Sequence, residues 1–192
     1  MFIKNWKKEI VTIPNLLSLF RLILLPVYVH IYMTATTDKQ FLVAGSIMVL
    51  SCLTDLFDGK IARSFNQITN LGKILDPLAD KITQFTLTFC LSLKYSVLHP
   101  VLALFIVKEL FQLIMGLIHF MQGRMLPGAL MSGKVCTTIL FVSLTALVLL
   151  PNMKSGFINF IATVDGIFLT ISFVSYISAY LGKNPKVQDM GA

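Results

Sequence analysis

The sequence predicts an all-α membrane protein of six transmembrane helices, preceded by a short amphipathic helix on the membrane surface. Of the 192 residues, 56% are hydrophobic and 13% are charged, whereas about a quarter of an average soluble domain is charged. The apolar residues gather in runs of about 18 or more, long enough to cross a hydrocarbon core as helices. These runs lack the alternation of hydrophobic and polar residues that a membrane β-barrel strand requires.

Short polar or Gly- and Pro-containing segments separate the six predicted spans. The spans cover roughly residues 13–34, 41–62, 74–96, 99–121, 133–151 and 157–181. We expect one domain at 13–182, between an interfacial segment at 1–12 and a cytoplasmic tail at 183–192. In the interfacial segment, apolar residues recur at helical spacing among lysines, which is typical of a helix lying on the inner leaflet. A frayed tail ahead of the first span is the alternative.

Basic residues favour one side of the membrane. That side carries Lys4, Lys7, Lys8, Lys60, Arg63, Lys73, Arg124, Lys134, Lys183 and Lys186, and the opposite side carries Lys39, Lys94 and Lys154. The positive-inside rule places the richer side, with both termini, in the cytoplasm, and we expect a bacterial cytoplasmic membrane. The net charge of +7 then reflects topology and attraction to anionic lipids. We expect no nucleic-acid partner, because the chain offers no soluble basic face.

Four of the nine acidic residues lie close together in the sequence, at Asp55, Asp58, Asp76 and Asp80. An ionised carboxylate at membrane depth is costly unless it is paired, hydrated or bound to a metal. Each pair occupies one face of its helix, because its members are three or four residues apart. We expect the two helices to be antiparallel neighbours, with the carboxylate pairs facing each other near the cytoplasmic ends. One or two divalent cations would relieve the repulsion, and all-oxygen ligation selects Mg²⁺ or Mn²⁺ before zinc.

The residues around these acids suit a phosphate-bearing ligand. Gly59, Ala62 and Gly72 leave the carboxylate face without bulk, and Arg63 offers a planar fork that matches phosphate. Paired metals with oxygen ligands recur in phosphoryl displacement, so we expect phosphoryl transfer at the membrane surface. Two alternatives are interhelical pairing of the acids with nearby Lys and Arg residues and a cation-coupled transporter, whose acids would spread through several spans.

The acidic segment resembles the signature of the CDP-alcohol phosphatidyltransferases, D-x2-D-G-x2-A-R-x8-G-x3-D-x3-D. The matching residues, with every spacing met, are Asp55, Asp58, Gly59, Ala62, Arg63, Gly72, Asp76 and Asp80. The resemblance implies that Asp55, Asp58 and Asp76 hold two metal ions, and that Asp80 completes the site and acts as general base. It also implies that Gly59, Ala62, Arg63 and Gly72 bind the cytidine diphosphate of CDP-diacylglycerol. A homodimer is a further implication.

Two more stretches resemble family members that use glycerol-type acceptors: IPNLLSLFRLILLPVYV in the first span and DPLADK around the third and fourth Asp. This resemblance implies transfer of a phosphatidyl group to glycerol 3-phosphate with release of CMP. Lys108 and Lys134 are the candidate contacts for the acceptor phosphate, although Lys108 alternatively pairs with Glu109. Members that use glycerol 3-phosphate typically have Arg at the Lys108 position, a second Arg where this chain has Gly116, Leu117 and His119, and a second basic residue where it has Cys136. Fewer cations suit phosphatidylglycerol as acceptor, so cardiolipin synthesis is the alternative.

Three other polar residues have two interpretations each. Asn15 and Arg21, in the first span, either point at the active site or serve helix packing and headgroup contacts. His119 is either a phosphate contact or an interfacial packing residue.

Overall fold

The computed structural model describes residues 12–64, 72–125, 128–182 and 188–189. It describes their side chains except at 13–14, 54–64, 73–74, 125 and 188–189. The predicted interfacial helix therefore lies outside the described residues.

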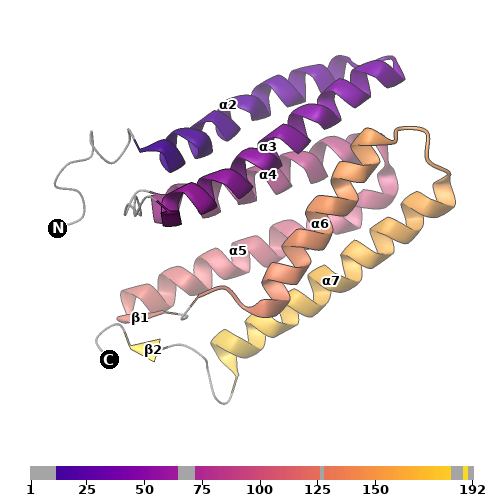
Figure 1. Cartoon of the computed structure of the whole chain (residues 1–192). Helices are drawn as coiled ribbons and strands as arrows, with labels where there is room; N and C mark the ends of the chain where they lie inside the picture. Colours follow the sequence, from indigo (N-terminus) through magenta and orange to yellow (C-terminus); the bar gives the residue numbers. More distant parts are fainter. Residues whose placement is uncertain (1–11, 65–71, 126–127, 183–187, 190–192) are drawn as a thin grey trace. The chain divides into compact units, whose positions relative to one another are not determined.

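Six α-helices make up most of the described chain (Figure 1). They are α2 (Ile13–Thr34), α3 (Asp38–Ser64), α4 (Gly72–Lys94), α5 (His99–Met121), α6 (Met131–Leu149) and α7 (Ser155–Leu181). A 3-10 turn, η1 (Ser96–Leu98), precedes α5, and two short strands, β1 (Arg124–Met125) and β2 (Gln188–Asp189), pair antiparallel. Each predicted span is a helix, with ends shifted by at most about three residues, the usual uncertainty of predicted ends.

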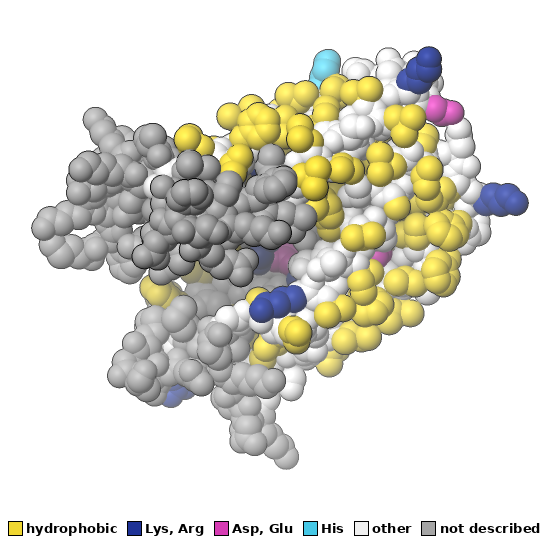
Figure 2. Space-filling model, viewed as in Figure 1, with side chains coloured by type: hydrophobic (Ala, Val, Ile, Leu, Met, Phe, Trp, Pro, Cys, Tyr) yellow, Lys and Arg dark blue, Asp and Glu magenta, His cyan; other side chains and the backbone are white. Residues whose placement is uncertain are grey.

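Four stretches of the described residues are long and apolar enough to cross a membrane: Asn15–Thr34, Ser96–Met121, Met131–Leu149 and Ser155–Leu181. Their outward side chains are apolar as well, since Ile23, Val142 and Phe160 are 65%, 62% and 62% exposed. Hydrophobic side chains predominate on the described part of the face in Figure 2. Soluble proteins rarely expose such continuous apolar surface. The chain is therefore an integral membrane protein.

The helices α3 and α4 are not among these four stretches. Both contain part of the acidic motif, and α4 carries Asp76, Asp80 and Lys81 within its first half. Six helices are thus present where six transmembrane helices were predicted. Among the described residues, only four stretches are long and apolar enough to cross a membrane.

The first of two compact units comprises Met1–Cys90 and Thr145–Asn152. Within it α2 packs along α3. The ring of Tyr32 on α2 meets that of Phe41 on α3, with 5.5 Å between centroids. Gly45 of α3 allows the end of α6 to approach, because a Cβ there would lie 2.5 Å from Cδ2 of Leu149.

The second unit comprises Leu91–Leu144 and Met153–Ala192. Within it α5 packs against α7, and the rings of Phe111 and Phe173 meet edge to face at 5.4 Å. The strands β1 and β2 tie the segment after α5 to the C-terminal segment through Arg124 and Asp189. Part of the predicted tail is therefore a strand, and a two-residue strand has no sequence pattern that would predict it.

Candidate functional site

The second half of the acidic motif lies on the first turns of α4. The helix begins at Gly72, which is buried, and Asp76 and Asp80 follow at four-residue steps on the same face. Both carboxylates contact α2: the Ser18 hydroxyl donates to Asp76, and the Arg21 guanidinium donates to Asp80. The predicted pair of carboxylates on one face of this helix is therefore present. Among the described side chains, both carboxylates contact residues of α2.

The helix α2 presents a matching polar stripe. Asn15, Ser18 and Arg21 are 1%, 0% and 2% exposed, so all three lie on the buried face of an otherwise apolar helix. Because Ser18 pairs with Asp76 and Arg21 pairs with Asp80, the two helices run in the same direction. Arg21 thus lies at the acidic motif, as one of its two interpretations required.

Ser18 was missed from the sequence. Its signal was available, because it stands three residues after Asn15 and three before Arg21, which places all three on one helical face. A serine in an apolar helix usually allows close helix packing. Under that interpretation Ser18 does not indicate a polar face shared with Asn15 and Arg21.

The ion pair between Arg21 and Asp80 is asymmetric in its exposure. The Arg21 side chain is 3% exposed, whereas the Asp80 side chain is 47% exposed. A buried guanidinium needs a carboxylate partner to offset its desolvation, and Asp80 supplies it. The open half of Asp80 remains accessible to a ligand or to water.

The first half of the motif lies on the last part of α3. Asp55, Asp58, Gly59, Ala62 and Arg63 belong to that helix, but their side chains lie outside the described residues. That the two carboxylate pairs face each other thus stays a prediction. Among the side chains the structure describes, no group of three or more His, Cys, Asp or Glu residues gathers to hold a metal.

The two candidate acceptor-binding lysines have different surroundings. Lys108, on α5, is 2% exposed and its ammonium donates to Glu109 at 2.6 Å. The same ammonium lies 5.9 Å from the ring centroid of Tyr176 on α7. Lys134, in the first turn of α6, is exposed. The pairing of Lys108 with Glu109, expected as an alternative, is present, so a phosphate at Lys108 would meet a partly neutralised cation.

The second unit contains a further buried acid. Asp165 of α7 is 1% exposed and accepts a hydrogen bond from Ser143 of α6, at 2.8 Å to either carboxylate oxygen. The Ser143 oxygen also lies 3.1 Å from the carbonyl oxygen of Leu140. Because this acid is closed to solvent and bonded between two helices, it links α6 to α7. Its position in the sequence, outside any motif, indicates no role for it.

His119 packs within its own unit. Its Nδ1 lies 2.9 Å from the carbonyl oxygen of Met115, and its ring is 5.2 Å from that of Tyr180 between centroids. These contacts favour the packing interpretation of His119 over a phosphate contact.

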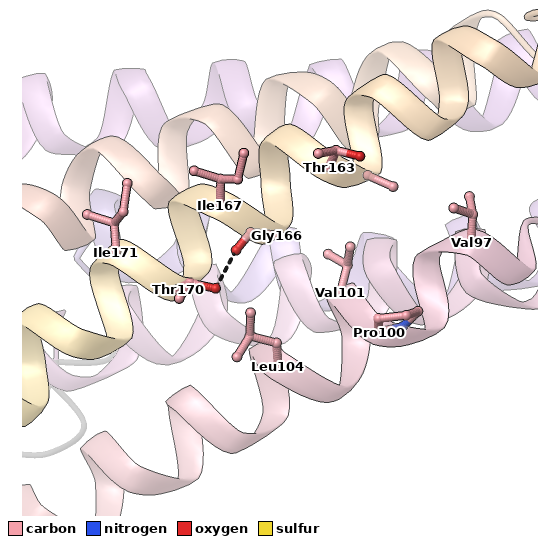
Figure 3. Close-up of a pocket in the computed structure, with 10 residues that line it drawn as sticks. Val97, Pro100, Val101, Leu104, Thr163, Gly166, Ile167, Thr170 and Ile171 are labelled. Carbon is pink, nitrogen blue, oxygen red and sulfur yellow. Dashed lines mark hydrogen bonds between the residues drawn. The ribbon is translucent and has the colours of Figure 1, made fainter.

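Two cavities of the second unit offer no charged side chains. A cavity of about 530 Å³ lies between α5 and α7 (Figure 3), where Thr163 and Thr170 donate their hydroxyls to carbonyls of their own helix. A second cavity, of about 470 Å³, lies between the start of α6 and the end of α7 and includes Ser132, Ser175 and Ser178. Neither is lined by a carboxylate, so neither is the predicted catalytic site.

Comparison with known proteins identifies the family. A model of the CDP-alcohol phosphatidyltransferase family matches residues 11–175, which include the whole acidic motif. A CDP-diacylglycerol--glycerol-3-phosphate 3-phosphatidyltransferase of Aquifex aeolicus (strain VF5) is 32% identical over 169 residues, 85% of this chain and 93% of the relative. The protein of the same name from Shigella flexneri serotype 5b (strain 8401) is 33% identical over 173 residues, 87% of this chain and 93% of the relative. That from Escherichia coli (strain K12) is 46% identical over 70 residues, 36% and 38% of the two chains. This membrane protein, with its acidic motif on α3 and α4, belongs to the CDP-alcohol phosphatidyltransferase family of enzymes.

Proposed function

We propose that this enzyme transfers the phosphatidyl group of CDP-diacylglycerol to glycerol 3-phosphate and releases CMP. The observation that carries the proposal is the complete eight-residue motif within a family match that spans 11–175. Relatives named for this reaction align over 93% of their own length, so the similarity extends well beyond the motif. This family membership also favours an enzyme over the cation-coupled transporter.

The donor chemistry of the motif fits divalent metal ions. Asp55, Asp58, Asp76 and Asp80 are all carboxylates, and their segment contains no His or Cys, so hard ions such as Mg²⁺ or Mn²⁺ are preferred. Asp76 is half-buried and Asp80 is half-exposed, which leaves both open to further ligands. We assign one or two ions to these four residues. When bound, such ions neutralise the diphosphate charge and the charge that develops on the leaving CMP.

The residues of the chain then have separate roles in the displacement. The acceptor hydroxyl oxygen forms a bond to the phosphorus that bears diacylglycerol, the bond from this phosphorus to the CMP oxygen breaks, and the hydroxyl proton passes to Asp80. Arg21 holds one oxygen of Asp80 in an ion pair and leaves nearly half of the Asp80 side chain open. Ser18 orients Asp76 by a hydrogen bond. Gly59, Ala62, Arg63 and Gly72 receive the cytidine diphosphate.

We propose glycerol 3-phosphate as the acceptor before phosphatidylglycerol, because the names of the relatives include glycerol 3-phosphate. One structural observation favours the second candidate, cardiolipin synthesis. Lys108 is partly neutralised by Glu109, and a singly charged phosphodiester needs fewer cations than a dianionic phosphate. We still assign Lys108 and Lys134 to the acceptor phosphate, as the resemblance to family members with glycerol-type acceptors implies.

The deciding experiment supplies the purified enzyme with CDP-diacylglycerol, Mg²⁺ or Mn²⁺, and one acceptor at a time. We expect CMP release and phosphatidylglycerophosphate with glycerol 3-phosphate. Product from phosphatidylglycerol alone would establish cardiolipin synthesis instead. If the enzyme released CMP neither with glycerol 3-phosphate nor with phosphatidylglycerol, both functions would be contradicted.

All six helices cross the membrane in this proposal, with both termini and the motif at the cytoplasmic side. Support comes from the charge asymmetry and from the parallel course of α2 and α4, which requires α3 to return between them. We also propose a homodimer in a bacterial cytoplasmic membrane. Fusion of a reporter that is active only in the cytoplasm to the C-terminus tests the orientation, and an inactive fusion would reverse it.

A further inference from the structure

Tyr176 of α7 contacts the two segments that carry the candidate acceptor cations. It is 5% exposed. The Lys108 ammonium of α5 lies 5.9 Å from the centroid of its ring, within the range of a cation–π interaction. On the side of α6, its hydroxyl accepts a hydrogen bond from the backbone N–H of Leu130 at 3.3 Å.

The bond to Leu130 bears on Lys134. The carbonyl oxygen of Leu130 accepts the backbone N–H of Lys134 at 3.1 Å, the first hydrogen bond at the start of α6. Leu130 is thus held by Tyr176 through its N–H and holds Lys134 through its carbonyl. The position of the Lys134 backbone therefore depends on the Tyr176 hydroxyl.

Gly133 brings α6 against the same ring. A Cβ at this position would lie 2.7 Å from the Tyr176 hydroxyl oxygen, closer than real Cβ contacts, and 3.0 Å from Cε2. Only glycine allows this approach without a shift of the ring or of the helix. The first turn of α6 and Tyr176 are consequently fitted to each other.

We propose that Tyr176 is a positioning residue for the acceptor: it sets the placement of Lys108 and Lys134 and thereby the affinity for the acceptor phosphate. This inference rests on the proposed function, since it takes both lysines as acceptor contacts. Tyr176 acts through its ring on Lys108 and through its hydroxyl on the start of α6. The donor site on α3 and α4 belongs to other residues, so Tyr176 should leave CDP-diacylglycerol binding unchanged.

The test measures KM for each substrate by CMP release, with the other substrate saturating. Tyr176→Phe keeps the ring and removes the bond to Leu130, and we expect an increase of about 2- to 10-fold in KM for glycerol 3-phosphate. Tyr176→Leu also removes the cation–π contact, and we expect an increase of about 3- to 30-fold, larger than that of Tyr176→Phe. KM for CDP-diacylglycerol should stay within about twofold in both. Tyr180→Phe, which removes the hydroxyl of the neighbouring tyrosine, is the matched control.

A second pair of variants keeps the inference testable if Tyr176→Leu does not fold. Gly133→Ala should raise the acceptor KM, because its methyl group meets the Tyr176 hydroxyl. Gly133→Ala combined with Tyr176→Phe should raise the acceptor KM by less than the product of the two single effects, since the 2.7 Å contact no longer exists. A merely structural role would lower the amount of folded enzyme and leave both KM values unchanged.

Equal changes in both KM values, or an acceptor KM within about twofold of wild type in every folded variant, would overturn the inference. Failure of the proposed function looks different: the wild-type enzyme would then release no CMP with glycerol 3-phosphate. That result would overturn the inference as well, before any variant is made.

Discussion

Replacement of the predicted base, Asp80→Asn, should destabilise the fold as well as stop the reaction. The Arg21 side chain is 3% exposed and would lose its ion pair with Asp80. Breaking a fully buried ion pair costs about 3–5 kcal/mol, whereas an exposed pair contributes about 0–1 kcal/mol. Since Asp80 is 47% exposed, we expect a loss of about 2 kcal/mol, between these limits.

The converse substitution should cost less. Arg21→Met removes the buried cation and leaves Asp80 half-exposed, where water can solvate it, so we expect a loss below about 1 kcal/mol. The double variant Arg21→Met/Asp80→Asn should recover most of the stability that Asp80→Asn loses, because the buried cation that Asp80 pairs with is then absent as well. It should remain inactive, since the base is still absent.

Thermal unfolding in detergent and CMP release separate these effects. A loss of about 2 kcal/mol corresponds to an unfolding temperature lower by about 4–8 °C for a chain of this size. Lys39→Gln, at an exposed cation of the same unit, is the control and should change neither quantity. An Asp80→Asn protein that unfolds at the wild-type temperature, or a double variant less stable than Asp80→Asn, would refute the reasoning.

Three further predictions concern the metal and the helix contacts. Chelation with EDTA should abolish CMP release and added Mg²⁺ or Mn²⁺ should restore it; activity that survives exhaustive chelation would contradict the metal assignment. Ser143→Ala leaves buried Asp165 without its donor and should cost about 1–3 kcal/mol, seen as a lower unfolding temperature, while Ser143→Thr keeps the hydroxyl and should be near wild type. Gly45→Leu should cost about 1–3 kcal/mol by overpacking against Leu149, and Gly45→Ala less, because Cδ2 is the end of a flexible side chain. Equal unfolding temperatures for wild type and both Gly45 variants would show that this approach of α6 to α3 is wrong.

The helices were predictable because their signal is local. A run of apolar residues long enough to cross a bilayer, ended by polar residues, needs no knowledge of the rest of the chain. The ends that shifted depend on caps, as at the start of α3. There the Gln40 side-chain oxygen accepts the backbone N–H groups of Thr36 and Thr37, at 2.7 and 3.1 Å, and the helix begins at Asp38 instead of 41.

The site was predictable only where its residues recur at a regular spacing along one helix. Asp76 and Asp80 share a face of α4 by their spacing, and the structure places both against α2. Their partners Ser18 and Arg21 lie 58 and 59 residues away, and no periodicity joins residues so distant. The contact between Gly133 and Tyr176 could not be predicted either, because it depends on the point at which two helices meet.

Two acids of the described helices, Asp80 and Asp165, differ most in the exposure of their side chains. Asp165 and Asp80 both lie in helices of a membrane protein and both accept hydrogen bonds from a neighbouring helix. Asp165 is 1% exposed, so neither a metal nor a substrate can reach it, and its hydrogen bond links α6 to α7. Asp80 directs one oxygen to Arg21 while nearly half of its side chain stays open. By its exposure, therefore, Asp80 can meet a ligand, whereas Asp165 in this arrangement cannot.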